Sequence, residues 1–239
     1  APPLVCRSAE SHVVSHEDAY RSVAALYDET WLRHYVASKL RRDGIFAAAY
    51  ELLRESNQPI LDIGCGVGLL PFYLRERGCT QLVIGLDIDT RKTQRAREIA
   101  AGRYDGVTFL DQNAGAALPQ FDGNVTMFDI LHYVPQPQQD GLLRHAASRV
   151  AGRGMLLLRD CVRDDSLRYR ITYWQERAAQ AIGWNVKVPF HFVSREEICA
   201  PFAPNEFSHE ERPMWGGGPF NNYLYIFRRI ASAVARAEG

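Results

Sequence analysis

PILDIGCGVGLLPFYL, residues Pro59 to Leu74, is the stretch that decides the fold class of this chain. A short apolar run is followed by glycines at every second position and then by apolar residues at helical spacing. This order predicts a buried strand, a tight turn and a helix, which is how α/β proteins hold nucleotide-type cofactors. The glycines alone do not identify the ligand, because any such turn needs positions without a Cβ.

Apolar strands and helical segments alternate on either side of this stretch. Strands are predicted at 59–63, 81–88, 106–110, 124–130 and 154–160, with helices at 69–78, 90–101 and 137–150. This alternation predicts a doubly wound α/β fold with a parallel sheet and right-handed crossovers. Beyond residue 160 we expect a helix in DDSLRYRITYWQERAAQAIGW, a capping box at Ser194 and Glu197, and two closing strands in EFSHEERP and NNYLYIFRR.

The N-terminal part of the sequence lacks the alternation of strands and helices and predicts helices alone. Residues 1–16 are expected to be a mobile lead-in, and 17–56 a helical cap in which Gly44 separates two helices. Residues 57–239 are expected to form the main domain, as a single structural unit with the cap.

Composition narrows the class of protein. With 239 residues the chain can form one well-buried α/β domain. Its net charge of zero counts against a nucleic-acid-binding role. The five cysteines form no CxxC or Cys/His cluster, so we expect no metal site and free thiols in a cytoplasmic protein. No apolar run approaches the roughly 20 residues of a membrane helix, and no signal peptide is indicated, so no membrane partner is expected.

The glycine spacing and its acidic neighbour indicate the kind of ligand. Gly64, Gly66 and Gly68 are spaced GxGxG, whereas the dinucleotide fingerprint is GxGxxG. Asp62 lies two residues before the first glycine, where a carboxylate would repel a pyrophosphate. It suits a ligand with an ammonium or sulfonium group, so a dehydrogenase is disfavoured.

Acidic and polar side chains close the next strands of the predicted sheet. Asp87 ends the second strand about 20 residues after the turn, the spacing at which a carboxylate binds the hydroxyls of a ribose. Asp111 and Gln112 end the third strand and could contact the exocyclic amine of an adenine. Asp129 ends the fourth. All these ends are expected on the carboxyl edge of one parallel sheet, where α/β proteins bind ligands.

The motifs LDIGCGVG, GLDID, FLDQNA and FDILHYVP, over about residues 58–160 plus the closing strand pair, resemble those of class I S-adenosylmethionine-dependent methyltransferases. The resemblance implies a Rossmann-like seven-stranded sheet in the order 3-2-1-4-5-7-6 with strand 7 antiparallel. It implies S-adenosyl-L-methionine as cofactor and S-adenosyl-L-homocysteine as product. The residues then expected to bind the cofactor are Asp62, Gly64, Cys65, Gly66, Gly68, Asp87, Ile88, Asp111, Gln112, Asp129 and Leu131.

A narrower likeness concerns the cap. WLRHYVASKLRRDGIF is similar to methyltransferase-like proteins of bacterial aryl-polyene pigment clusters. It implies that Tyr35 and Lys39 face the cofactor carboxylate. The alternative is a solvated helix face beside an apolar stripe.

Methyl transfer mainly requires alignment of the acceptor with the methyl group. A general base is needed only where the acceptor carries a proton, as a phenol does. His132, just after the fourth strand, is the candidate base; the alternative is a structural histidine bonded to a backbone carbonyl. Tyr133, Asp160 and His191 are expected near the acceptor, together with Tyr35 and Lys39. The other histidines are expected at the surface.

Three functions remain open at this point. The first is a small-molecule methyltransferase, with O-methylation of an aromatic or apolar acceptor, free or attached to a carrier. The second is a nucleic-acid methyltransferase, disfavoured because no D/N-P-P-Y motif follows the fourth strand and no basic excess exists. The third is a non-catalytic module that binds S-adenosylmethionine.

Overall fold

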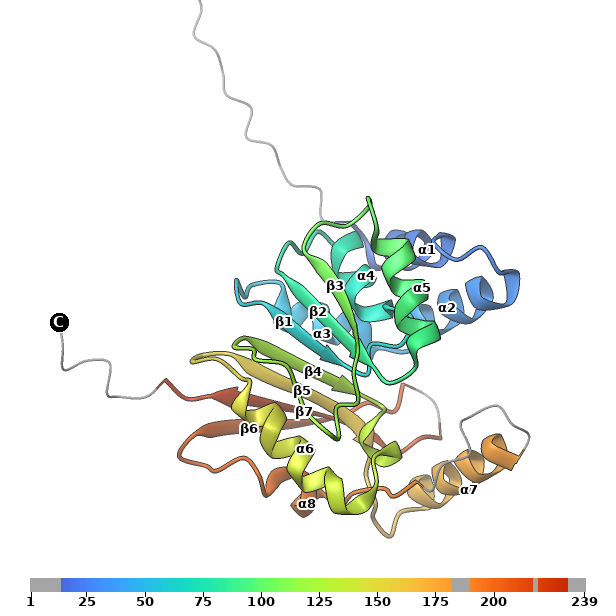
Figure 1. The fold of residues 1–239 in the computed structure, drawn as a ribbon. Helices are drawn as coiled ribbons and strands as arrows, with labels where there is room; N and C mark the ends of the chain where they lie inside the picture. Colours follow the sequence, from blue (N-terminus) through green and yellow to red (C-terminus); the bar gives the residue numbers. More distant parts are fainter. Residues whose placement is uncertain (1–13, 182–189, 217–218, 232–239) are drawn as a thin grey trace, which may run out of the picture.

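A computed structural model describes residues 14–181, 190–216 and 219–231 and contains a seven-stranded sheet (Figure 1). The strand order is β3-β2-β1-β4-β5-β7-β6, and β7 runs antiparallel to β5 and β6. This confirms the order expected from the sequence motifs. The strands are β1 Ile60–Ile63, β2 Val83–Asp87, β3 Val107–Asp111, β4 Asn124–Phe128, β5 Met155–Cys161, β6 Phe207–Pro213 and β7 Asn222–Arg229.

Helices cover both faces of the sheet. One apolar core lies between the sheet and α1 to α5, and a second lies under α6 and α8, in agreement with Figure 1. Strand β1 is buried at all four positions, as expected for a central parallel strand. The helices are α1 His16–Ala25, α2 Thr30–Arg42, α3 Ile45–Leu53, α4 Leu69–Glu76, α5 Thr90–Ala100, the short 3-10 helix η1 Leu131–Tyr133, α6 Gln136–Ser148, α7 Leu167–Ala181 and α8 Arg195–Cys199.

The cap contains three helices and not the two expected. The additional break falls between α1 and α2, where Tyr27 is buried and its hydroxyl donates a hydrogen bond to the carbonyl of Val67 at 2.9 Å. A continuous helix through this segment was therefore a wrong prediction. His16, expected at the surface, is half-buried, with its Nδ1 2.7 Å from the hydroxyl of Tyr73. Both contacts attach the cap to the glycine turn and to α4.

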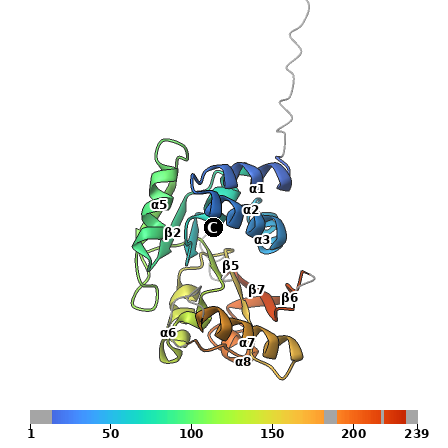
Figure 2. The ribbon, with the colours of Figure 1, turned by 90° about the vertical axis from the view of Figure 1, so that its right-hand side faces the viewer.

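The later elements follow the sequence pattern closely. Ser194 and Glu197 form the predicted capping box at the start of α8. Because β7 is antiparallel to its neighbours, the loop after β6 lies on the carboxyl edge of the sheet, and Met214 in this loop packs against the core of α1 to α5. In Figure 2, α2 and α7 lie on the side of the molecule that faces the viewer, above and below the sheet edge.

The described residues contain neither a candidate membrane-spanning helix nor a candidate metal cluster. Within the described ranges, no helix combines the length and the apolar composition needed to cross a membrane. Nor does any group of three or more histidine, cysteine, aspartate or glutamate side chains in those ranges lie close enough together to hold a metal ion.

Candidate active site at the carboxyl edge of the sheet

The glycine turn after β1 leaves backbone accessible to a ligand. Gly64, Gly66 and Gly68 all have left-handed backbones, with φ of 79°, 56° and 88°, which favour glycine. A Cβ on Gly64 would overlap Ile130, and a Cβ on Gly68 would lie 2.8 Å from Phe72. At Gly66 nothing lies within 4 Å, so this is the part of the turn that a ligand can approach.

Cys65 lies beneath the turn and not on its open side. Its side chain is buried, and burial raises the pKa of the thiol above its ordinary value. The backbone N–H groups of Gly64 and Cys65 both donate to the carbonyl of Leu86, at 2.7 and 3.0 Å. Cys65 therefore packs in the core and fixes the turn against β2.

Asp62 is a buried carboxylate behind the turn. Its Oδ1 accepts a hydrogen bond from the Thr126 hydroxyl at 2.7 Å, and no described residue donates to its second oxygen. Burial raises the pKa of Asp62 to about 7; the Thr126 hydrogen bond opposes this shift and the charge of Asp87 adds to it. A carboxylate with one unpaired oxygen in such a place suits a cationic ligand group.

Asp87 joins the turn to the end of β2. Its Oδ2 accepts from the N–H of Gly66 at 2.9 Å and its Oδ1 from the N–H of Asp89 at 2.9 Å. The carboxylate is half-exposed and each of its oxygens retains a lone pair. Ile88 beside it is 70% exposed, so its side chain can cover a ligand on this edge.

The structure directs Asp111 away from the turn. Its carboxylate accepts hydrogen bonds from Thr93 and from Arg97, at 3.0 Å, both on α5. The hydrogen bond from Arg97 holds the pKa of Asp111 below its ordinary value. Gln112 stays close to Asp87, to whose carbonyl its N–H donates at 3.0 Å.

Four charges meet where β4 and β5 end, and we call Lys39, Asp43, Asp129 and Arg159 the four-charge cluster. Arg159 is buried; its Nε lies 2.8 Å from Oδ1 of Asp129 and its Nη1 2.5 Å from Oδ1 of Asp43. Lys39 lies 2.8 Å from Asp43 and 3.4 Å from Asp129. The cluster therefore ties α2 to the sheet edge.

The cluster also sets the state of Asp129. This residue has a φ of 57°, unusual for a side chain with a Cβ, and Ile130 after it abuts Gly64. Burial alone would raise the pKa of Asp129, but Arg159 and Lys39 hold it below its ordinary value. Asp129 is thus an ionised group that positions the start of the next segment.

Lys39 and Tyr35, the two cap residues predicted for the site, differ in their contacts. Lys39 lies at the carboxyl edge of the sheet, where its partners are two carboxylates of the chain itself. Tyr35 is exposed on α2 and contributes nothing to the four-charge cluster. Sequence reasoning missed Arg159; its signal is an arginine that directly follows the apolar run MLLL and precedes Asp160.

A histidine–aspartate pair lies on the same edge. Nδ1 of His132 is 2.6 Å from Oδ1 of Asp160, whose oxygens also accept from the N–H groups of His132 and Cys161 at 3.3 and 2.7 Å. A carboxylate only accepts, so Nδ1 carries the proton and Nε2 is left as the basic nitrogen. The hydrogen bonds that His132 makes with other described residues use its backbone and Nδ1, and none uses Nε2.

The pair is buried, which shapes its acid–base behaviour. Burial lowers the pKa of His132, but the charge of Asp160 and its hydrogen bond more than offset this, so the pKa lies above its ordinary value of 6.5. Asp160, expected beside the acceptor, is fully buried and contacts His132. Leu131, next to His132, is buried in the core.

Aromatic rings from three segments gather on and around His132. The members of this aromatic shell touch His132 or one another with ring centroids 4.1 to 6.3 Å apart: Tyr133, Tyr169, Tyr173, Phe190 and Phe192. The hydroxyl of Tyr133 donates to Glu176 of α7 at 2.5 Å. The shell therefore consists of η1, α7 and the segment before α8.

His191 belongs to this region through its backbone. Its N–H donates to the carbonyl of His132 at 2.9 Å, and its carbonyl accepts from Gln139 at 2.8 Å. The imidazole makes none of the described ring contacts of the aromatic shell, and its Nε2 is buried without a described partner. The structure thus brings His132, Tyr133 and Asp160 together and leaves the imidazole of His191 outside the shell.

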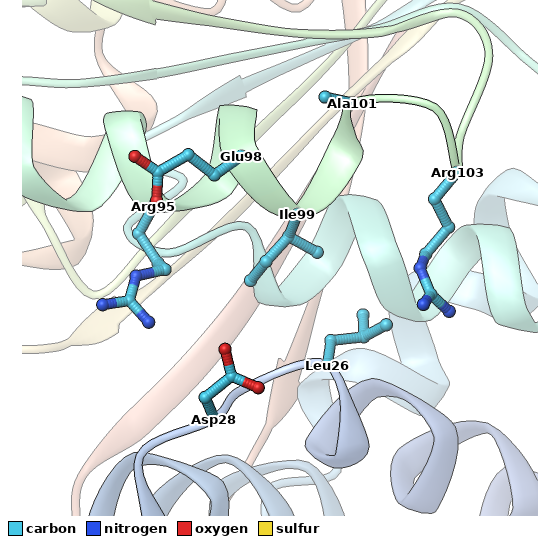
Figure 3. A pocket seen from close by; sticks show the side chains of 7 residues that line it. All are labelled: Leu26, Asp28, Arg95, Glu98, Ile99, Ala101 and Arg103. Carbon is cyan, nitrogen blue, oxygen red and sulfur yellow. The ribbon is translucent and has the colours of Figure 1, made fainter.

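Two hollows lie elsewhere on the surface. One, of about 290 Å³, lies between α5 and the α1–α2 connection; Figure 3 shows Arg95, Ile99 and Arg103 pointing toward Leu26 and Asp28. The other, of about 600 Å³, is at the amino edge of the sheet and includes Tyr50 and Arg77. Neither hollow is lined by a residue that the sequence predicted for the site.

Comparisons with known proteins agree with the geometry. Residues 32–207 match the family described as Methyltransferase domain. Over 88 residues, 36% of this chain and 34% of the relative, the sequence is 34% identical to a tRNA1(Val) (adenine(37)-N6)-methyltransferase of Dickeya chrysanthemi (strain Ech1591). The chain spans at most about a third of the length of the curated relatives it matches.

Solved structures of low identity share the fold. Magnesium protoporphyrin IX methyltransferase (ChlM) from Synechocystis PCC 6803, solved with bound SAH, is similar with a TM-score of 0.59 at 20% identity, over 89% of this chain and 93% of that one. Mitomycin 7-O-methyltransferase MmcR is similar with a TM-score of 0.59 at 18% identity, over 88% of this chain and 60% of that one.

Proposed function

The chain belongs to the methyltransferase domain family, whose cofactor is S-adenosylmethionine, and we propose that it transfers the cofactor's methyl group to the oxygen of a small aromatic or apolar acceptor. The cofactor, when bound, supplies a methyl group already activated by the sulfonium. The protein's own residues then have to bind it, align the acceptor, exclude water and accept a proton.

The carboxyl edge offers groups that fit this cofactor. Gly66 provides backbone with open space before it, and Asp62 provides a buried carboxylate for the ammonium group. Asp87 provides acceptors for the two ribose hydroxyls. We assign the adenine side to Gln112 and Ile88, since Asp111 is engaged by α5.

One observation carries the proposed chemistry. Nδ1 of His132 is held by Asp160, while Nε2 has no described partner and lies within the aromatic shell. His132 is thus arranged to take the proton of an acceptor hydroxyl at Nε2, while Asp160 stabilises the resulting imidazolium. A phenol-type acceptor suits this arrangement because the rings of the shell can pack against it.

The test is methyl transfer from labelled S-adenosylmethionine to a panel of phenols, aryl acids, carrier-bound acyl chains and transfer RNA. We expect label on a phenol or aryl acid. His132→Gln should then lower the rate about 10²- to 10⁴-fold while cofactor binding is retained.

His145→Gln is the matched control, because His145 is an exposed histidine near the end of α6. It should keep the wild-type rate. Label on RNA alone would contradict the proposed acceptor class. A full rate in His132→Gln would contradict its role as the base.

A further inference from the structure

Helices α2 and α7 each carry more basic than acidic residues, although the chain has no net charge. Helix α2 carries Arg33, Lys39, Arg41 and Arg42 and no acid. Helix α7 carries three arginines and one glutamate. Lys39 belongs to the four-charge cluster, whose charges cancel, and Glu29 is paired with Arg95, so Arg33, Arg41 and Arg42 are the remaining cations of α2. The two helices therefore give one part of the surface a positive excess.

Helix α7 exposes apolar residues along one side. Leu167, Ile171, Trp174 and Ala178 recur at steps of four, three and four residues, so they share one side of the helix, and all are exposed. Leu167 is 71% and Trp174 68% exposed. The opposite side carries Tyr169 and Tyr173, which belong to the aromatic shell. Helix α7 is therefore apolar on both its inner and its outer side.

Arginines border this outer apolar side. Arg170 and Arg177 are both exposed and, at seven residues apart, lie along the same flank of α7. On the other flank, the guanidinium of Arg168 lies 4.5 Å from the ring of Trp215, which is also partly exposed. Long cationic side chains beside tryptophan, leucine and isoleucine are typical of helices that lie in a membrane interface.

Helix α2 repeats the pattern at the same end of the molecule. Trp31 and Tyr35, one turn apart, are both exposed, and Arg42 follows on the same side of the helix. Figure 1 shows α2 and α7 projecting at the same end of the molecule, and Figure 2 shows both facing the viewer. Exposed aromatic and aliphatic groups framed by cations therefore extend over the outer sides of both helices.

We propose that the outer sides of α2 and α7 form a docking surface for a lipid membrane that carries anionic headgroups. The apolar side chains would enter the boundary between headgroups and acyl chains, and the arginines would contact the anionic headgroups. The membrane would then lie about one helix diameter, roughly 10 Å, from the aromatic shell on the inner side of α7. An acceptor dissolved in the membrane could reach His132 from there.

The kind of side chain favours a membrane over the other partners that a basic surface could attract. Nucleic acids bind through cations and stacked aromatics, and they offer nothing to Leu167 and Ile171. A second copy of the chain would place the positive helices of both copies against each other if the interface were symmetric. An anionic membrane matches both the aliphatic groups and the charge.

The test is co-sedimentation of the full chain with vesicles. Vesicles of phosphatidylcholine mixed with phosphatidylglycerol should retain the protein, and vesicles of phosphatidylcholine alone should retain much less. Replacing both Arg170 and Arg177 by glutamine should weaken binding about fivefold for each arginine. Trp174→Ser should weaken it at least fivefold.

Matched controls lie on the opposite edge of the sheet. Leu82→Ser removes a leucine before β2 that is 63% exposed, close to the 68% of Trp174, and Arg103→Gln removes an exposed arginine after α5. Both should bind vesicles as the wild type does, and all variants should keep its unfolding temperature. Since vesicle binding requires no methyl transfer, its outcome is independent of the proposed chemistry.

Three results would overturn the proposal. The first is equal binding to neutral and anionic vesicles. The second is loss of binding in the control variants to the same extent as in the α7 variants. The third is no vesicle binding together with a Trp174-dependent dimer in sedimentation velocity, or with Trp174-dependent retention of RNA.

Discussion

Replacing Asp62 by asparagine is expected to stabilise the protein without cofactor and to weaken cofactor binding. Asp62 is buried, and its pKa is raised from 3.8 to about 7. At pH values near 8 the folded protein therefore holds a buried, ionised carboxylate that costs free energy relative to the unfolded chain. The pKa difference of about three units corresponds to roughly 4 kcal/mol.

The sign of this effect depends on pH. Well below 3.8 the carboxyl group is protonated in both states, so it contributes no penalty. The penalty grows as the pH rises from the unfolded to the folded pKa, and it is complete above about 7. Asparagine cannot ionise and can still accept the hydrogen bond from Thr126. Asp62→Asn should thus gain about 4 kcal/mol near pH 8, and little near pH 4.

Thermal unfolding and calorimetric titration measure the two halves of this prediction. The unfolding temperature should rise by roughly 10 °C near pH 8, while the affinity for S-adenosylmethionine should fall about tenfold to hundredfold. Asp122→Asn, a substitution at an exposed position, is the control and should change neither quantity. An equal gain in stability at both pH values would refute the reasoning, because ionisation could not then be the cause.

Three further substitutions test other parts of the edge. In Arg159→Met, Lys39 is the only cation left beside the carboxylates of Asp43 and Asp129. The free energy of unfolding, measured by urea titration, should fall by about 3–5 kcal/mol. A loss below about 1 kcal/mol would contradict the stabilising role of the four-charge cluster. Gly64→Ala should destabilise more than Gly102→Ala, because both backbones are left-handed but only the first Cβ meets a neighbour; equal unfolding temperatures would speak against this. Asp87→Ala should lower cofactor affinity more than tenfold in calorimetry, whereas the exposed control Asp105→Ala should not.

The sheet could be predicted from the sequence because each strand end carries a local signal. Alternating apolar strands and helices predict a parallel sheet, and Asp62, the glycines and Asp87 mark strand ends, whereas the order of the strands was implied by the resemblance to the family. The two closing strands were predicted from EFSHEERP and NNYLYIFRR, and the antiparallel direction of the last strand was implied by the resemblance.

The partners of the charged groups could not be predicted in the same way. Arg159 joins Asp43, which is 116 residues away in the sequence, and no local pattern marks such a pair. Asp160 was expected at the acceptor because it ends a strand, but its contact with His132 depends on where η1 folds back. The break before α2 depends on Tyr27 reaching Val67, again a tertiary contact.

The exposure of the outer sides of α2 and α7 could not be predicted from the sequence either. Helical periodicity identifies one apolar side of α7, and the usual interpretation is that this side is buried. The structure packs the side with the half-buried Tyr169 and Tyr173 against the aromatic shell and exposes the side with Leu167 and Trp174. Only the placement of the helix beside the sheet edge decides which side faces outward.

The pH dependence of kcat/KM in the wild type and in Asp160→Asn tests the central claim most directly, with an acceptor hydroxyl that does not itself titrate in the range measured. The wild-type rate should rise with pH as His132 loses its proton, with a midpoint above 6.5 because Asp160 raises its pKa. In Asp160→Asn the burial of His132 is opposed only by the smaller effects of Asp129 and Glu176, so the midpoint should move to lower pH and the plateau should fall. An unchanged midpoint in the variant, or a wild-type rate that does not depend on pH, would contradict the account.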